Sequence, residues 1–161
     1  MGSSPTSGSV TADETATDET AAARPATGAD MRSVAALRAR ALEELRAVRG
    51  GELYAAREAV DLPPAGDPDR PVWVGELAGA VVGYLTGSVA DRLGAIDGVY
   101  VDPGCRAVGV GEAMINEALA WFRARQCIGV DATALPGARA TKNFFEETGF
   151  TARLLVMHRP L

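Results

Sequence analysis

A short glycine-containing turn between an apolar stretch and an amphipathic stretch is the part of this sequence best suited to chemistry. Residues 95–101 are mostly apolar and end at an Asp-Pro-Gly turn, and residues 110–125 carry apolar side chains at helical spacing. A strand that enters a helix through such a turn leaves the first N–H groups of the helix without internal partners, and the helix dipole favours an anion there. Arg106 adds a guanidinium able to hold a phosphate with two hydrogen bonds. The turn therefore predicts an anion site.

Two common phosphate-binding motifs do not fit this turn. A P-loop requires Lys and then Ser or Thr after its second glycine, but Val110 and Gly111 follow Gly109. A dinucleotide-binding fingerprint requires a third glycine where this chain has Met114. Nucleotide-phosphate binding by an unrelated α/β domain is therefore an alternative that neither motif supports. What remains is Arg106-Ala107-Val108-Gly109-Val110-Gly111, which has the form Arg/Gln-x-x-Gly-x-Gly/Ala.

With this hexapeptide the chain resembles the GNAT superfamily of acetyl-CoA-dependent N-acetyltransferases. A second similar piece lies downstream, where residues 140–150 read ATKNFFEETGF and approach the family's A-x-x-F-Y-E-x-x-G-F helix ending. The resemblance covers about residues 72–159. It implies transfer of an acetyl group from acetyl-CoA to a primary amine by direct attack, with no metal. The alternative is an ordinary strand–turn–helix crossover in which the glycines serve only close packing.

The resemblance also implies which residues hold acetyl-CoA. In this family the strand before the turn splays from its neighbour, and the pantetheine arm pairs with the backbone groups that are freed. Here those groups belong to Val99, Tyr100 and Val101, and an N–H near Val99 would also bond the thioester oxygen. Phe145, in the second motif, is expected to pack against the pantetheine or in the core. The diphosphate is expected beside Arg106, on the N–H groups of Ala107, Val108, Gly109, Val110 and Gly111.

Two carboxylates are candidates for the general base that takes a proton from the amine. Asp97 lies two residues before Val99 on the expected cofactor strand, where family members often carry an acidic residue. A solvated carboxylate at a strand end is the alternative for this residue. Asp131 lies in the middle of a later strand and is the second candidate, with a structural, hydrogen-bonded carboxylate as its alternative.

The general acid is where the sequence departs most from the family. A tyrosine often stands in the second motif to protonate the leaving thiolate, but this chain has Phe145, which has no proton to give. Ala138 stands in the place of an asparagine that often contacts the cofactor. Two hypotheses follow. The first is an enzyme in which the thiolate leaves unassisted, with the help of water or through another residue. The second is a catalytically weak or inactive acyl-CoA-binding module on the same scaffold.

Composition limits the setting in which this chain works. The chain has 161 residues, 47% of them hydrophobic, and a formal net charge of −5, so there is no global basic field to draw nucleic acid. Cys105 and Cys127 form neither a disulfide framework nor a zinc site, which favours the cytoplasm. No apolar run approaches the length of a membrane span. The expected partner is a small-molecule or peptide amine of unspecified identity, and the family resemblance admits a homodimer.

The elements that must position the site follow from periodicity and chain breakers. Residues 1–30 predict a disordered acidic tail, followed by one N-acetyltransferase domain over residues 31–161. The element order predicts an α+β fold with a mixed, mainly antiparallel sheet flanked by helices. We find no candidate before residue 31 for the strand that usually opens such domains, so we expect this strand to be missing. We predict helices over residues 31–49, 52–59, 110–125 and 138–147, a loop over 62–71, and strands over 72–74, 80–88, 95–101, 128–135 and 150–158.

Overall fold

A computed structural model describes residues 20–57, 61–159 and 161 of the chain, so residues 1–19 of the expected tail lie outside the described part. Its single sheet has the strand order β1-β2-β3-β4-β5. Neighbouring strands are antiparallel except β4 and β5, which are parallel. The predicted α+β fold is therefore confirmed. The elements in chain order are β1 (Ala22–Pro25), η1 (Gly28–Asp30), α1 (Met31–Arg46), α2 (Gly51–Arg57), β2 (Val72–Leu77), β3 (Ala80–Ala90), β4 (Leu93–Val101), η2 (Pro103–Cys105), α3 (Val110–Ala124), β5 (Gly129–Ala132) and α4 (Arg139–Glu147).

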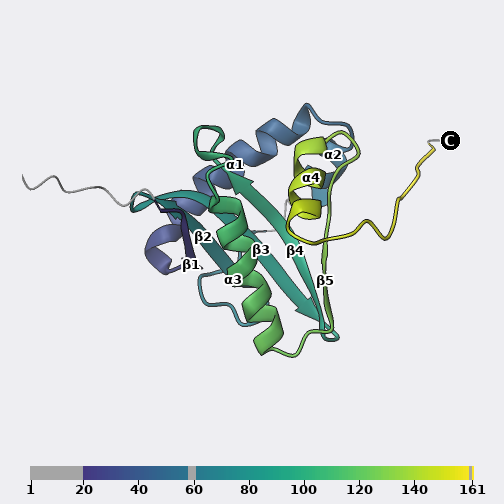
Figure 1. Ribbon diagram of the computed structural model, residues 1–161. Helices are drawn as coiled ribbons and strands as arrows, with labels where there is room; N and C mark the ends of the chain where they lie inside the picture. Colours follow the sequence, from purple (N-terminus) through teal and green to yellow (C-terminus); the bar gives the residue numbers. More distant parts are fainter. Residues whose placement is uncertain (1–19, 58–60, 160) are drawn as a thin grey trace, which may run out of the picture.

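Helices cover both faces of the sheet (Figure 1). Helix α3 lies across β1, β2 and β3 on one face, and α1 packs on β3 and β4. Each contact buries the apolar stripe that the sequence places on the helix, because a stripe at helical spacing must be covered. No helix in the described part of the chain is both long and apolar enough to cross a bilayer.

The first strand is present, which corrects the expectation that it is missing. Strand β1 pairs with β2 from Ala22 to Pro25, and the expected tail therefore differs from the structure over residues 20–30. Its sequence, AARP, has almost no strand preference, so tertiary contacts must hold it in place. Arg24 supplies them, because its guanidinium binds the Asp30 carboxylate at 2.7 Å and the Glu76 carboxylate at 2.7 Å.

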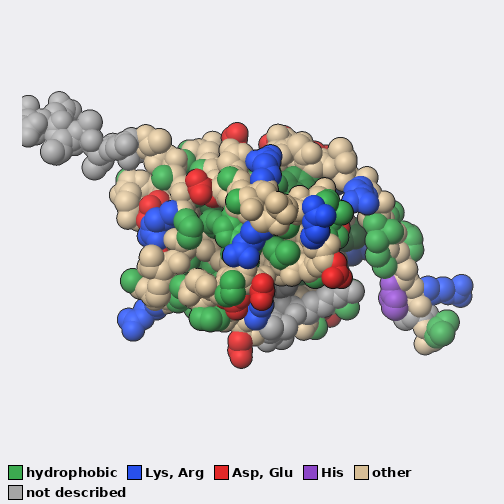
Figure 2. All heavy atoms as spheres, turned by 90° about the horizontal axis from the view of Figure 1, so that it is seen from below, with side chains coloured by type: hydrophobic (Ala, Val, Ile, Leu, Met, Phe, Trp, Pro, Cys, Tyr) green, Lys and Arg blue, Asp and Glu red, His purple; other side chains and the backbone are tan. Residues whose placement is uncertain are grey.

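The end of the chain also differs from prediction. Strand β5 covers only Gly129–Ala132 instead of residues 128–135, because its ladder with β4 stops at the pair Ile96 and Ala132. Residues 151–159 form no strand, although residues 150–158 are predicted to close the sheet. In the space-filling view this segment, marked by the purple side chain of His158, stands clear of the body (Figure 2).

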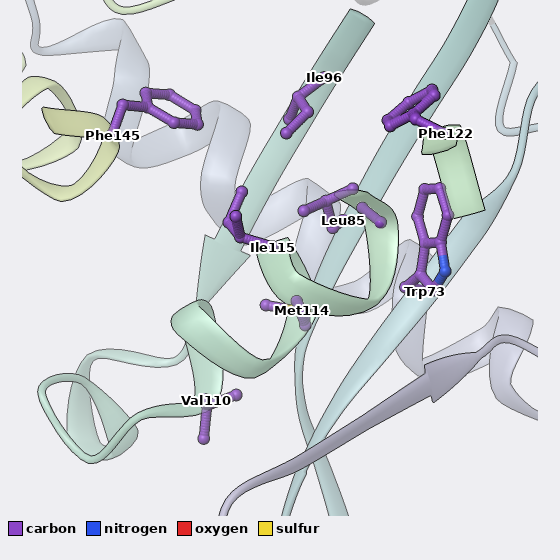
Figure 3. Close-up of a cluster of buried hydrophobic side chains, with 9 residues drawn as sticks. Trp73, Leu85, Ile96, Val110, Met114, Ile115, Phe122 and Phe145 are labelled. Carbon is purple, nitrogen blue, oxygen red and sulfur yellow. The ribbon is translucent and has the colours of Figure 1, made fainter. Parts of the chain in front are cut away.

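The main core lies between the sheet and α3. Its buried side chains come from β2, β3, β4, α3 and α4, and Figure 3 shows them gathered around the first turns of α3. Gly75 of β2 permits this close approach, because a Cβ atom there would lie 2.5 Å from Cγ1 of Val110. The core therefore fixes the start of α3 against the sheet, and with it the turn that precedes the helix. The cluster consists of Trp73, Leu85, Ile96, Val110, Met114, Ile115, Ala118, Phe122 and Phe145.

Candidate active site

The turn between β4 and α3 is built by local hydrogen bonds and two residues of positive φ. The Asp102 side chain accepts a bond from the N–H of Gly104 at 3.3 Å, which closes the Asp-Pro-Gly turn. Ala107 then has φ of +63° and Gly109, the residue before α3, has φ of +90°. Glycine adopts this left-handed conformation without steric cost, whereas a larger side chain is strained there. The turn thus directs the chain into α3 with its N–H groups exposed.

These N–H groups are free within the described part of the chain. The first backbone bond from the turn into α3 joins the N–H of Ala113 to the carbonyl of Gly109 at 2.9 Å. None of the N–H groups from Ala107 to Glu112 donates to another described backbone oxygen. Ala107, Val108 and Gly109 are exposed to solvent. The turn therefore presents the row of unpaired donors at a helix start that an anionic ligand requires.

Gly111 has a packing role, which is the role that the alternative interpretation of the turn assigns to its glycines. A Cβ atom at this position would lie 2.9 Å from Cε2 of Phe144, so the bare backbone lets α4 pack against the start of α3. Phe144 in turn contacts Phe145, with ring centroids 5.5 Å apart. The two motifs of the sequence are thus joined by direct contact.

Arg106 lies in the turn but its guanidinium is engaged elsewhere. Its Nε donates to the backbone oxygen of Val101 at 2.9 Å, and its Nη2 donates to Glu44 of α1 at 2.9 Å. It also stacks over the Tyr100 ring, 5.2 Å from the centroid. These contacts tie the turn to α1, and the place of the Arg106 side chain beside a phosphate stays a prediction.

Glu44 joins Arg106 to the buried hydroxyl of Tyr100. The Tyr100 hydroxyl donates to Glu44 at 2.6 Å, and this bond, together with that from Arg106, lowers the pKa of Glu44. Burial and the bond to Glu44 raise the pKa of Tyr100 to about 12, so the phenol stays protonated. The Tyr100 side chain packs in the cluster beneath α1, and only its backbone belongs to the predicted cofactor strand.

Strand β4 has an open edge where the cofactor strand is expected. Its ladder with β5 ends at Ile96, and no strand of the described residues pairs with residues 97–101 on that side. The N–H of Asp102 donates toward β3, to the oxygen of Val82 at 2.8 Å. Because successive N–H groups of a strand point in opposite directions, those of Val101 and Val99 face the open edge. Apart from the Val101 oxygen, which accepts a hydrogen bond from Arg106, this edge is therefore available to an extended, amide-containing ligand.

A β-bulge at Asp97 shapes the middle of β4. Gly98 pairs with Thr86 and Ile96 pairs with Gly87, so Asp97 has no partner on β3. The bulge explains why Ile96 and Val99, three residues apart, both pack in the α3-side core. The backbone oxygen of Asp97, which has no ladder partner, accepts a hydrogen bond from the Tyr54 hydroxyl of α2. Sequence reasoning placed Asp97 on the strand but did not identify the bulge.

A pocket opens at this bulge, between the diverging ends of β4 and β5. We call it the β4–β5 pocket; it has about 390 Å³ of empty space, part of it open to solvent. Of the described residues that line it, Asp97 alone carries a charge. Phe145 reaches it from α4, on the side of β4 that carries Ile96 (Figure 3). The lining residues are Leu45, Tyr54, Ile96, Asp97, Gly98, Val99, Thr133, Leu135, Ala138, Thr141 and Phe145.

The pocket makes Asp97 a better proton acceptor than an ordinary aspartate. Burial raises the pKa of Asp97, and this effect outweighs a hydrogen bond from Ser88 and the positive charge of Arg70. Asp131, the second candidate, is exposed on β5 and lies 3.6 Å from Arg153, outside the lining of the pocket. The structure therefore brings together Asp97, Val99 and Phe145 and leaves Asp131 apart.

Several lining residues have no signal in the sequence. Tyr54 lies on a short helix whose place over β4 depends on tertiary packing, and Leu45 is one of many apolar residues of α1. Thr133 directly follows β5 and Thr141 lies on α4, and only the packing of these elements brings both residues to the pocket. The described residues contain no group of three or more His, Cys, Asp or Glu side chains placed to hold a metal ion.

Comparisons with known proteins establish the fold and the family. No curated protein sequence matches the chain. An aminoglycoside acetyltransferase, meta-AAC0020, from an uncultured soil metagenomic sample, solved with sisomicin, is 19% identical. The match covers 89% of this chain and 97% of the other, with a TM-score of 0.66. A ribosomal-protein-alanine N-acetyltransferase from Brucella melitensis biovar Abortus 2308 is 16% identical, with 88% and 99% covered and a TM-score of 0.64.

A third solved structure contains acetyl coenzyme A. A putative streptothricin acetyltransferase from Bacillus anthracis, solved with acetyl coenzyme A, is 22% identical, with 54% and 51% covered and a TM-score of 0.51. At these identities the solved structures establish the fold. The model of the acetyltransferase (GNAT) family matches residues 34–150, a range that includes the turn, β4 and all the lining residues of the β4–β5 pocket. The chain therefore belongs to the GNAT acetyltransferase family.

Proposed function

We propose that this protein transfers an acetyl group from acetyl-CoA to a primary amine, by direct attack of the amine on the thioester. The observation that carries the proposal is that three features follow one another along β4 and the turn after it. Asp97 lines a pocket at the bulge, Val99 follows it at the open edge of β4, and the unpaired N–H groups of residues 107–112 follow the end of the strand. An acyl-CoA has a thioester, an amide-rich arm and a diphosphate in the same order.

Binding of the donor would use backbone groups. The diphosphate would accept hydrogen bonds from the free N–H groups of residues 107–112, where the dipole of α3 also favours negative charge. The pantetheine amides would pair with β4 along its open edge, as an added strand does. The N–H of Val99 would bond the thioester oxygen and stabilise the oxyanion that develops from it.

The reaction then requires a neutral amine. Asp97 would take a proton from the ammonium, directly or through water, and its raised pKa suits this task better than that of a solvated aspartate. The amine nitrogen forms a bond with the carbonyl carbon and gives up a second proton to water, and the bond from this carbon to sulfur breaks. The products are an amide and the CoA thiolate.

Phe145, which stands in the place of the family's tyrosine, has no proton to give to the thiolate. Phe145 is 5% exposed and packs against Phe150, with ring centroids 5.2 Å apart. A thiolate is a good leaving group, so a water molecule in the open pocket suffices to protonate it. We infer that Phe145 shapes the pocket wall and takes no part in proton transfer.

The acceptor is an amine small enough to enter a pocket that has one carboxylate. Structural neighbours act on aminoglycosides and on a ribosomal protein's alanine, and we propose an acceptor of one of these two kinds, a small polyamine-like molecule or a peptide N-terminus. A cytoplasmic site of action agrees with the two free thiols of Cys105 and Cys127.

The second hypothesis, an acyl-CoA-binding module with little catalysis, is supported by Phe145 and Ala138, because both line the pocket without a polar group. One experiment separates the two. Release of free CoA thiol from acetyl-CoA is measured over a panel of aminoglycosides, polyamines and short peptides. Amine-dependent turnover supports the enzyme. Tight acetyl-CoA binding without turnover for any amine supports the module, and absence of binding refutes both.

A further inference from the structure

A hydrogen bond at the β4–β5 pocket has no part in the mechanism proposed above. The Tyr54 hydroxyl, on α2, donates to the backbone oxygen of Asp97, and both residues line the pocket. The extra residue of a bulge is left out of the ladder, so its backbone groups need partners from elsewhere. Asp97 is this residue, because its two neighbours on β4 pair with consecutive residues of β3. The bond therefore gives the bulge a support that β3 does not supply.

Close packing at the end of α1 holds Tyr54 over the bulge. A Cβ atom at Gly51, the first residue of α2, would lie 1.7 Å from the backbone oxygen of Leu45, so the chain turns there only with glycine. Leu45 itself lines the pocket. Helix α1 is fixed beside β4 in turn, because the Tyr100 hydroxyl donates to Glu44 at 2.6 Å. The place of the Tyr54 hydroxyl is thus set by the packing of α2 on α1 and of α1 on the sheet.

The side chain of Asp97 has a separate partner. Ser88 of β3 donates a hydrogen bond to its carboxylate, and the positive charge of Arg70 acts on it as well. The residues that follow on β4 are held differently, because Val99 pairs with Leu85 in the ladder. Loss of the bond at the bulge would therefore disturb Asp97 before it disturbs the open edge of the strand.

We propose that Tyr54 is a positioning residue, whose hydroxyl fixes the backbone of the bulge and so aims the Asp97 carboxylate into the pocket. The inference rests on the proposed function, in which this carboxylate takes the proton of the amine. A bulge can re-aim a side chain next to an active site, and the aim holds only while the extra residue is fixed. The alternative is that Tyr54 itself protonates the CoA thiolate. The geometry favours positioning, because the phenol hydrogen is already donated to the Asp97 oxygen.

The first test is a double-mutant cycle in the full chain, read as thiol release at saturating acetyl-CoA and amine. Tyr54→Phe keeps the ring in the pocket wall and removes only the hydroxyl. We expect kcat to fall about tenfold or more, but less than about twofold when the same change is made in Asp97→Asn, because a positioning residue loses its effect once its target is gone. An equal loss in both backgrounds would indicate a direct role for Tyr54. That result, or an unchanged kcat in Tyr54→Phe alone, would overturn the proposal.

The second test needs no turnover, so it separates this inference from the proposed function. The pKa of the Asp97 carboxyl is measured by ¹³C NMR without substrate, in the unmodified full chain, in Tyr54→Phe and in Ser88→Ala. Burial raises this pKa, so Tyr54→Phe, which frees the carboxylate to leave the pocket, should lower it toward the ordinary value of 3.8. Ser88→Ala removes a hydrogen bond that lowers the same pKa and should therefore raise it.

The two proposals can thus fail separately. An unchanged pKa in Tyr54→Phe would overturn this inference, and activity of the unmodified chain toward an amine would leave the proposed function standing. A lowered pKa in a chain that turns over no amine would support the hold of Tyr54 on Asp97 and refute the proposed function.

Discussion

Substitution of Asp97 by asparagine tests the catalytic part of the account. The change keeps the size of the side chain and removes its ability to take a proton. The bulge places this carboxylate at the pocket, and burial raises its pKa, which is the environment expected of a general base. Loss of such a base costs about 10²–10⁴-fold in rate, which corresponds to about 2.7–5.4 kcal/mol of transition-state stabilisation.

The assay is steady-state thiol release with a fixed amine and varied acetyl-CoA. We expect kcat to fall by this factor while KM for acetyl-CoA stays within about twofold, because Asp97 lies on β4 before the donors of the turn. The unmodified enzyme should gain activity as pH rises through the raised pKa of Asp97, since the charged carboxylate is the active form. The Asp97→Asn variant should lack this dependence.

Two comparisons sharpen the result. Asp91→Asn makes the same chemical change in the turn between β3 and β4, where Asp91 is exposed and has φ of +49°, a conformation that asparagine tolerates. Asp131→Asn tests the second candidate base, which lies outside the pocket. Unchanged kcat in Asp97→Asn, or a larger loss in Asp131→Asn, would refute the assignment.

Three further predictions concern the turn, the core and the first strand. Gly109→Glu should weaken acetyl-CoA binding at least tenfold by calorimetry, because it strains a residue with φ of +90° and places a carboxylate beside the N–H groups that bind the anion. Unchanged affinity would exclude the turn as the site that binds the diphosphate. Phe145→Ala should lower the free energy of unfolding by about 3–5 kcal/mol in urea, since the ring is buried between Phe144 and Phe150; a loss below about 1 kcal/mol would contradict this packing. Asp30→Asn should cost about 1–3 kcal/mol at neutral pH, because Arg24 lowers the pKa of Asp30 and the carboxylate stabilises the fold only while ionised. This difference should begin to shrink as pH falls below 3.8, the ordinary pKa of aspartate, and should be lost only below the much lower pKa that Asp30 has in the folded chain; a difference that stays constant well below pH 3.8 would argue against the ion pair.

The sequence predicts those elements that are determined by residues close to one another in the chain. Helix α3 begins at Val110, as expected, because a glycine turn and an apolar stripe at helical spacing both lie within one stretch. The two motifs around Gly109 and Phe145 also indicate the family, which the match over residues 34–150 confirms. The free N–H groups follow directly from the geometry of any helix start.

What the sequence does not predict depends on partners far along the chain. The four residues of β1 form a strand because β2 and the ion pairs of Arg24 hold them, and no local pattern reveals this. The bulge at Asp97 arises from the register between β3 and β4, which one strand alone does not define. Residues 151–159 show the opposite case, since their pattern suits a strand but the described chain offers them no paired neighbour.

The central claim is that unpaired backbone donors at the start of α3 bind the diphosphate of acetyl-CoA. The most direct measurement is a titration of the ¹⁵N-labelled full chain with CoA, followed through its amide resonances. We predict that the largest shifts belong to the N–H groups of residues 107–112, with a second group at Val99 and Val101 on the open edge of β4. Saturable binding of CoA that leaves the amides of residues 107–112 unmoved would contradict the account.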